Sequence, residues 1–125
     1  MILCDTNILI EVYRKNTNVI SELSRITRYS TIVISDVTRA EMLVGARNKH
    51  EMQVLIKELG QLKSLPLQSE ISACAIQLLE EYHLSHGLDF HDALIAATSI
   101  CHNIELFTLN VKDFIFISNV KLHDA

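Results

Sequence analysis

Short apolar runs alternate with longer amphipathic stretches along the chain, which is the pattern of strands and helices in an α/β fold. The apolar runs are rich in aliphatic and β-branched residues, as expected of strands buried on both faces of a parallel sheet. We expect strands at residues 2–5, 31–34 and 104–108, a short strand or crossing at 64–67, and a brief fifth strand at 120–122. Pro66 favours a sheet edge for the segment that contains it, because proline cannot donate to a central ladder.

The amphipathic stretches place apolar residues three and four positions apart, the spacing of one buried helical face. Ser35 fits the N-cap of one such helix, and Gly87 interrupts the chain before the last one. We expect helices from about residue 6 through Val12, and at 17–28, 35–48, 50–63, 69–84 and 90–102. The alternation of strands and helices predicts an α/β domain with a mostly parallel central sheet of four to five strands.

The length of 125 residues, the hydrophobic fraction of 49% and the single proline indicate one compact domain over residues 1–125. No apolar run reaches the roughly 18 residues that span a bilayer, and no basic segment precedes the apolar N-terminus as in a signal peptide. Cys4, Cys74 and Cys101 are odd in number and widely spaced, which is typical of core cysteines in a reducing compartment. We therefore expect a cytoplasmic protein without a membrane segment.

The net charge of −4 is unevenly distributed along the chain. Residues 1–50 contain seven basic and five acidic residues, a balance of +2, whereas residues 51–125 contain four basic and ten acidic residues, a balance of −6. A basic face beside an acidic centre is compatible with nucleic-acid binding, and Arg14, Lys15 and Arg39 are candidate contacts with RNA. Each of them also fits a solvated helix face, so charge alone does not decide the function.

Four acidic residues stand at or beside the ends of the expected elements. Asp5 ends the first strand and Glu41 lies on the helix after the second. Asp92 lies in the first turn of the last helix, and Asp113 lies in the loop after the fourth strand. Because the carboxyl ends of parallel strands meet at one edge of a sheet, where ligands gather, we expect these four carboxylates to converge on one pocket.

Each acid also has an explanation that needs no site. An aspartate at a strand end often caps the following helix, as Asp5 would. Asp92 suits a helix N-terminus, which it shares with Asp89, and Asp113 fits an ordinary loop acid. Glu41 is harder to explain, because we expect its helix to be mostly buried and a buried charge needs a partner or a metal.

Carboxylates gathered in one pocket call for a cation. Two of them about 4 Å apart repel by roughly 1 kcal/mol in water and by about 4 kcal/mol at an effective dielectric of 20, so they raise one another's pKa or bind a divalent ion. Oxygen ligands of this kind suit Mg²⁺ or Mn²⁺. Such an ion lowers the pKa of a bound water and offsets charge on a phosphodiester, which is nuclease or phosphatase chemistry.

Four motifs in this order resemble the signature of PIN-domain ribonucleases, and in particular of the VapC-type toxins of bacterial toxin–antitoxin pairs. They span nearly the whole chain, and four in order are far more specific than one. The motifs are DTN at 5–7, TRAEMLVG at 38–45, DALIAAT at 92–98 and TLNVKDF at 108–114. The resemblance implies a three-layer α/β/α domain that cleaves RNA with Mg²⁺ or Mn²⁺.

The resemblance also implies roles for the acids. Asp5, Glu41 and Asp92 correspond to the core acids, with Asp5 and Asp92 as direct metal ligands and Glu41 able to act through water. Members of the family place a fourth acid where Asn110 or where Asp113 stands here, and we expect Asp113 because Asn110 carries no charge. On this interpretation the metal orients and activates a water for in-line attack on phosphorus.

Polar neighbours of the acids have implied supporting roles. Thr6 and Asn7 would position the metal shell or the first helix, and Thr108 would bond a carboxylate or the scissile phosphate. Many relatives carry a basic residue directly after this threonine, whereas this chain has Leu109, so a phosphate contact from that position is not expected. The family further implies a homodimer and a cognate antitoxin whose C-terminal segment covers a groove near the first helices.

Three other interpretations are open. Asp5 could be the nucleophile of a phosphatase, but that chemistry usually requires a second aspartate where Asn7 stands. The domain could also be a catalytically silent binding module. His83, His86 and His91 could suggest zinc, but Gly87 breaks their helix and no cysteine joins them.

Overall fold

The computed structural model describes residues 1–124. Its centre is a four-stranded sheet in the order β3-β2-β1-β4, and every neighbouring pair of strands is parallel. The strands are β1 (Ile2–Cys4), β2 (Ile32–Ser35), β3 (Lys63–Leu65) and β4 (Glu105–Phe107). The third strand lies at a sheet edge, as Pro66 predicts.

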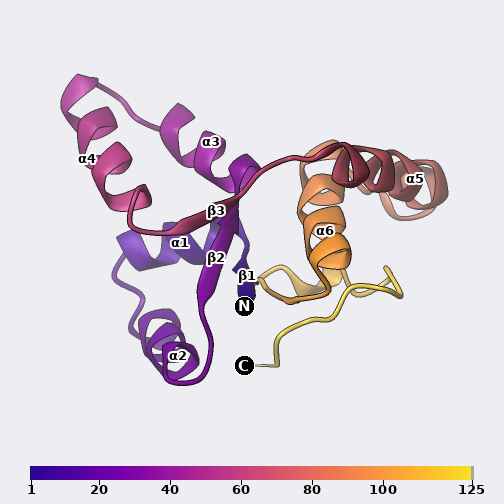
Figure 1. Ribbon diagram of the computed structural model, residues 1–125, viewed down its shortest axis with the longest axis horizontal. Helices are drawn as coiled ribbons and strands as arrows, with labels where there is room; N and C mark the ends of the chain where they lie inside the picture. The colour runs from indigo at the N-terminus through magenta and orange to yellow at the C-terminus, as the bar shows by residue number, and fades with distance from the viewer. Residues whose placement is uncertain (125) are drawn as a thin grey trace.

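Six α-helices connect or cover these strands (Figure 1). They are α1 (Thr6–Tyr13), α2 (Thr17–Thr27), α3 (Asp36–Val44), α4 (Lys49–Leu59), α5 (Ser69–His86) and α6 (Phe90–His102), followed by a single 3₁₀ turn at Val111–Asp113. In Figure 1, α1 and α2 lie on one side of the sheet and α5 and α6 on the other. The predicted α/β/α layering is therefore confirmed.

The alternation of side chains along the strands builds two separate cores. Leu3 and Val33 face α5 and α6, where they join a cluster with Ala93 and Ile95. Their neighbours on the opposite face, such as Cys4, belong to a second cluster. That cluster also contains Ile2, Ile34, and residues of α1, α2 and α4. Successive residues of a strand point to opposite faces, so strands of three or four residues are enough to bind both layers of helices.

Three predicted elements differ from the structure. The helix expected at 50–63 ends at Leu59, and Lys63 already belongs to β3. The helix expected at 35–48 begins as predicted, with the Ser35 side chain accepting from the backbone N–H of Val37, but it ends at Val44. Asn48 does not extend it, because its side chain caps α4 by accepting from the N–H of Glu51 at 2.9 Å. The expected fifth strand is reduced to one parallel bridge between Leu106 and Leu122.

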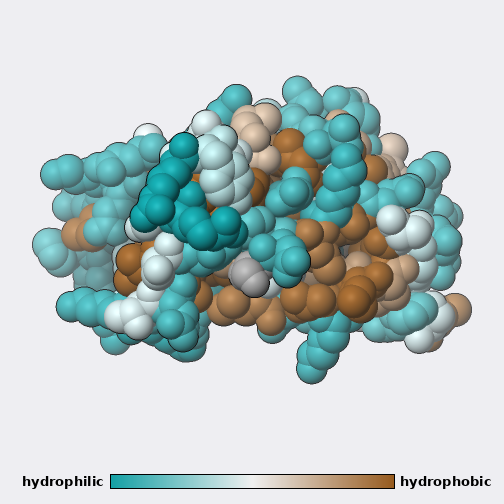
Figure 2. Space-filling model, turned by 90° about the horizontal axis from the view of Figure 1, so that it is seen from below, coloured by the Kyte–Doolittle hydropathy of each residue, from teal (hydrophilic) through white to brown (hydrophobic). Residues whose placement is uncertain are grey.

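The surface hydropathy differs between the two sides of the sheet. On the face seen in Figure 2, hydrophilic residues dominate the left half, and hydrophobic residues gather on the right half, the side on which α5 and α6 lie in Figure 1. None of the helices within residues 1–124 has the length and apolar composition that a bilayer crossing requires.

Candidate metal centre

Asp5 occupies the carboxyl end of β1, in the middle of the sheet, and only 4% of its surface is exposed. Its Oδ1 accepts a hydrogen bond from the backbone N–H of Thr6 at 2.8 Å, which makes Asp5 the N-cap of α1. Its Oδ2 accepts from the hydroxyl of Thr108 at 2.9 Å, just after β4. The capping interpretation and the pocket interpretation of Asp5 are thus compatible, since one carboxylate does both.

A polar network around Thr108 joins the first helix to the chain after β4. The side-chain amide of Asn7 donates to the Thr108 hydroxyl at 3.2 Å and lies 3.4 Å from Asp5 Oδ2. Its carbonyl oxygen accepts from the N–H of Leu109 at 3.3 Å, and the N–H of Asn110 donates to the Thr108 hydroxyl at 3.0 Å. Every one of these bonds restricts the position of the Asp5 carboxylate or of its partner.

Glu41 reaches the same place from α3. The Thr6 hydroxyl donates to Glu41 Oε1 at 2.7 Å and lies 3.0 Å from the hydroxyl of Thr38, one turn earlier in α3. The expectation of a mostly buried helix here was wrong: Thr38 is the buried residue of α3, whereas the Glu41 side chain is 43% exposed and Val44 is 84% exposed. Glu41 therefore faces an open cleft, and burial alone does not demand a partner for it.

Asp92 stands in the first turn of α6, where the side chain of Asp89 caps the helix by accepting from the Asp92 N–H at 2.8 Å. Between Asp92 and Glu41 lies His91, which sequence reasoning left out of the site. Its Nδ1 lies 3.2 Å from Asp92 Oδ1, and its Nε2 forms an ion pair with Glu41 Oε1. One ligand atom each from Asp89, His91 and Asp92 lie within 4.8 Å of one another.

The charges in this centre perturb one another. Burial raises the pKa of Asp5 above its usual value, and the negative charge of Asp92 adds to this, while the hydrogen bonds from Thr108 and Thr6 and the nearby His91 oppose it. The hydrogen bond to Asp92 and the charge of Glu41 outweigh partial burial and raise the pKa of His91 to about 9. The imidazole is therefore a cation at neutral pH, lying between two carboxylates.

The structure brings together Asp5, Glu41 and Asp92, through Thr6 and His91. Asp113 ends the 3₁₀ turn and is half-buried, and within residues 1–124 its side chain makes no hydrogen bond or ion pair. The structure therefore does not link Asp113 to the three acids by any direct contact. Asn110 takes part through its backbone N–H, and its side chain forms no cap bond.

The three candidate RNA contacts differ in how exposed their side chains are and in whether they are already paired within the protein. Arg14 is 72% exposed, although it is paired with Glu11 at 3.3 Å. Lys15 is exposed just after α1, whereas Arg39 is half-buried and donates to the carbonyl of Leu59 at 3.1 Å. Arg39 therefore holds α3 against the end of α4, and its guanidinium is already engaged in the fold.

A cleft of about 870 Å³ opens beside the acids, with Thr6 and Glu41 in its lining. Its walls come from α1 and from the α3–α4 region, and they combine apolar side chains with two arginines. They include Ile10, Tyr13, Met42 and Leu55 together with Arg14 and Arg47. An acidic centre thus connects to a groove edged by two arginines, Arg14 paired with Glu11 and Arg47 paired with Glu51.

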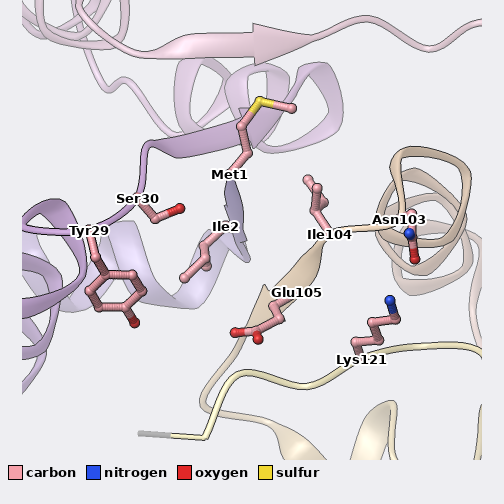
Figure 3. A pocket seen from close by; sticks show the side chains of 8 residues that line it. All are labelled: Met1, Ile2, Tyr29, Ser30, Asn103, Ile104, Glu105 and Lys121. Atoms are coloured by element: carbon pink, nitrogen blue, oxygen red, sulfur yellow. The ribbon is translucent and has the colours of Figure 1, made fainter.

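A second depression, of about 310 Å³, lies at the amino ends of the strands (Figure 3). Met1 and Ile104 are among its lining residues, which also include one carboxylate, Glu105, and one ammonium, Lys121. A pocket with balanced charge has no need of a bound cation. The acids gather at the carboxyl ends of the strands, where α/β folds hold their ligands.

The donor set at the acidic end fits a divalent cation. Carboxylate oxygens predominate, and the His91 imidazole adds a nitrogen donor, which Mn²⁺ accepts more readily than Mg²⁺ does, once it has lost its proton. A buried carboxylate with a raised pKa gains stability when a positive charge arrives. The cluster of Asp89, His91 and Asp92, with Asp5 beside it, therefore has the composition of a metal site.

Comparison with known proteins agrees with this geometry. The PIN domain family matches residues 2–116. The chain belongs to the PIN domain family. Ribonuclease VapC1 of Rickettsia felis is 31% identical over 121 residues, covering 90% of this chain and 87% of the relative. Ribonuclease VapC10 of Mycobacterium tuberculosis is 30% identical over 122 residues, covering 97% of this chain and 91% of the relative.

Solved structures extend the PIN match to the whole fold. VapBC2 of Rickettsia felis, solved with a DNA fragment from its promoter, aligns with a TM-score of 0.84 and 26% identity over 100% of this chain and 99% of that one. A toxin–antitoxin complex from Klebsiella pneumoniae aligns with a TM-score of 0.79 and 30% identity, over 96% and 95% of the two chains. The predicted resemblance to VapC-type PIN proteins is therefore confirmed.

Proposed function

We propose that this PIN domain is a metal-dependent endoribonuclease and the toxin of a bacterial toxin–antitoxin pair. The observation that carries the proposal is the convergence of Asp5, Glu41 and Asp92, from three separate elements, on one network at the carboxyl ends of the strands. The relatives are named ribonucleases, and the aligned structures are toxin–antitoxin complexes. PIN ribonucleases depend on a metal, which accounts for carboxylates gathered this closely.

In this proposal Asp5 and Asp92 are the direct ligands of Mg²⁺ or Mn²⁺, and Glu41 assists through a water. The bound ion would supply a water of lowered pKa and offset negative charge on the phosphate. The chain itself supplies orientation: the Thr6 N–H and the Thr108 hydroxyl hold the two oxygens of Asp5 in fixed directions. Asn7 holds Thr108 in turn, so the network prevents Asp5 from rotating away.

Asp113 is proposed as the fourth acid, entering the site when metal and RNA are bound. It follows Asn110, which is bonded to Thr108, by three residues. A half-buried carboxylate without a hydrogen bond or ion pair within residues 1–124 is free to turn toward a cation. Asp113→Asn should therefore weaken metal binding less than Asp92→Asn does.

The groove beside the acids supports the proposed partners. Arg14 and Arg47 at its edges are paired with glutamates but are mostly exposed, so they can reach the phosphates of RNA. Its apolar lining at Ile10 and Met42 suits an antitoxin segment that covers it. We place the protein in the cytoplasm, where its RNA substrate and its antitoxin would be, and we propose that it acts as a homodimer.

Cleavage of structured RNA by the purified protein tests the proposal. We expect cleavage with Mn²⁺ or Mg²⁺, none after EDTA, and none by Asp5→Asn with either ion. Glu22 lies in α2 and pairs with His123, which also contacts Glu105 at the start of β4. Glu22→Gln is therefore the matched control and should cleave like the wild type. Hydrolysis of a small phosphoester with RNA left intact would indicate an aspartate-nucleophile phosphatase instead. Metal binding without any cleavage would indicate a silent module and would overturn the proposal.

A further inference from the structure

Two of the three cysteines lie on helices that pack against each other, Cys74 in α5 and Cys101 in the last turn of α6 (Figure 1). The sequence predicts core positions for all three, but only Cys4 is buried. Cys74 is half-buried and Cys101 is exposed, although its neighbour Ile100 packs against the core. The prediction was therefore wrong for Cys101, and solvent can reach this pair.

The Cys101 sulfur lies directly over the turn of α5 that ends at Cys74. Its Sγ is 3.8 Å from the backbone carbonyl oxygen of Glu70, which stands one turn before Cys74. Side chains of a helix lean toward its N-terminus, so the Cys74 sulfur leans over the same turn. Burial raises the pKa of the Cys74 thiol, and the neighbouring Cys101 thiol adds to this shift.

Small residues bring the two helices close enough for a covalent link. Ala75 follows Cys74 and is completely buried, as are Ala93, Ala96 and Ala97 along α6. Helices whose contact residues are small pack with their axes near the lower end of the usual 8–10 Å range. A disulfide needs Cβ atoms about 4 Å apart, a separation set by the spacing of the two helices, and side-chain rotation then turns the two sulfurs toward each other.

Other chemistry for this thiol pair is less well supported. A structural zinc needs four ligands, and the only group of three clustered metal-binding side chains within residues 1–124 is Asp89, His91 and Asp92, at the opposite end of α6. Two neighbouring thiols without further zinc ligands are suited to oxidation to a disulfide instead.

We propose that Cys74 and Cys101 form a dithiol site that is oxidised to an internal disulfide by low-molecular-weight disulfides such as oxidised glutathione. Exposed Cys101 loses a proton and attacks one sulfur of the oxidant, whose S–S bond breaks and releases one glutathione thiolate. Cys74 then loses a proton and attacks the mixed disulfide at the Cys101 sulfur, which expels the second glutathione. The two cysteines together lose two protons and two electrons, and the oxidant is reduced to two thiols.

The disulfide joins α5 to the helix whose first turn carries His91 and Asp92. Closing the loop between residues 74 and 101 restricts the unfolded chain, so oxidation should raise the midpoint of thermal unfolding by about 10 °C. The inference does not depend on the proposed ribonuclease activity, because thiol oxidation and stability are measured without RNA or metal.

Exposure of the full chain to oxidised glutathione, followed by alkylation and intact mass analysis, tests the site. We expect the loss of two hydrogens, a single cross-linked peptide pair containing Cys74 and Cys101, and reversal by a reducing agent. Cys4→Ser should behave like the wild type if it folds, and Cys4→Ala is the substitute if it does not. Cys74→Ala should instead retain one glutathione on Cys101 and should show no rise in thermal stability on oxidation.

Three outcomes would overturn the inference. The first is a stable glutathione adduct on Cys101 of the wild type, which would mean that Cys74 cannot reach it. The second is a disulfide-linked dimer through Cys101. The third is the loss of two hydrogens from Cys101→Ser, which would mean that the oxidised pair is a different one.

Discussion

The two ends of the parallel sheet contain the same arrangement of side chains with opposite electrostatic results. At the carboxyl ends of the strands, His91 lies between Glu41 and Asp92. At the amino ends, His123 lies between Glu22 at 2.7 Å and Glu105 at 3.1 Å. Each imidazole thus contacts one carboxylate through each of its nitrogens.

The difference lies in how much positive charge accompanies each histidine. Arg25 forms two hydrogen bonds with Glu22, at 2.8 and 2.6 Å, and these bonds, helped by His123, lower the pKa of Glu22 to about 2. At the other end no lysine or arginine within residues 1–124 pairs with Asp5 or Asp92, and burial raises the pKa of Asp5. At the amino ends of the strands, Arg25 and His123 pair with the carboxylates. At the carboxyl ends, the carboxylates outnumber the cationic side chains, so a bound metal ion is needed to balance their charge.

The largest effect that this comparison predicts is on catalysis. Asp92→Asn removes a proposed metal ligand without changing the size of the side chain, so RNA cleavage should fall on the order of 100-fold or more. Glu22→Gln makes the same chemical change at the opposite end and should leave cleavage unchanged. Initial rates on one RNA at saturating Mn²⁺ compare the two variants, with circular dichroism as the check on folding. Equal losses of activity in both would contradict the distinction between the two ends.

The response of stability to metal should be the next largest effect. A divalent ion at ten times its dissociation constant should stabilise the wild type by about 1.4 kcal/mol, because it binds only the folded protein. Asp5→Asn should show no such gain, since it lacks a ligand. Urea unfolding with and without Mn²⁺ measures both proteins, and an equal gain in the two would place the ion elsewhere.

Without metal, Asp5→Asn should be more stable than the wild type at pH 7. The pKa of Asp5 is raised in the folded state, so its ionised form lowers stability at any pH above its unfolded value of 3.8. The advantage of the variant should disappear as the pH falls below that value. A variant that is less stable than the wild type at pH 7 would show that the bonds from Thr6 and Thr108 outweigh burial.

Glu22 should show the opposite dependence on pH. Its pKa in the folded protein is about 2 against an ordinary value of 4.5, so its contribution is complete above pH 4.5 and is lost as the pH falls from there toward 2. Glu22→Gln should therefore cost about 1 kcal/mol at pH 6. The same substitution should cost almost nothing at pH 2, as urea unfolding at the two pH values would reveal. A constant cost at both values would mean that charge plays no part.

Most of the strands and helices can be predicted from the sequence, because each is specified by residues that are close together in the chain. The β-branched run at 31–34 and the Ser35 cap specify a strand and a helix start from adjacent residues. The end of α3 was misplaced because Asn48 fits either a helix interior or a cap, and only its bond to Glu51 decides between them.

The site was harder to predict in its details than in its acids. His91 adjoins Asp92 in the sequence, but its contact with Glu41 joins residues 50 positions apart and depends on how α3 packs against α6. The same limit applies to the exposure of Glu41, since its neighbours Met42 and Leu43 suggest a buried helix face while the cleft beside it leaves the carboxylate open. His91 could have been predicted as part of the site, because it is a titratable residue directly beside the proposed metal ligand Asp92.

The smallest predicted effect concerns RNA binding at the edge of the acidic end. Arg14 lines the groove that contains Glu41 and is mostly exposed, whereas Arg28 follows α2 and lies near the amino ends of the strands. A single phosphate contact contributes about 0.7 to the slope of log affinity against log salt for single-stranded RNA. Arg14→Ala should lose this increment of the slope and bind RNA several-fold more weakly at physiological salt, while Arg28→Ala should match the wild type.

Fluorescence anisotropy at four salt concentrations, in Ca²⁺ to prevent cleavage, measures both slopes. Identical slopes for the two variants would mean that RNA does not follow the groove, and the basic residues of the first half of the chain would then serve only to solvate it.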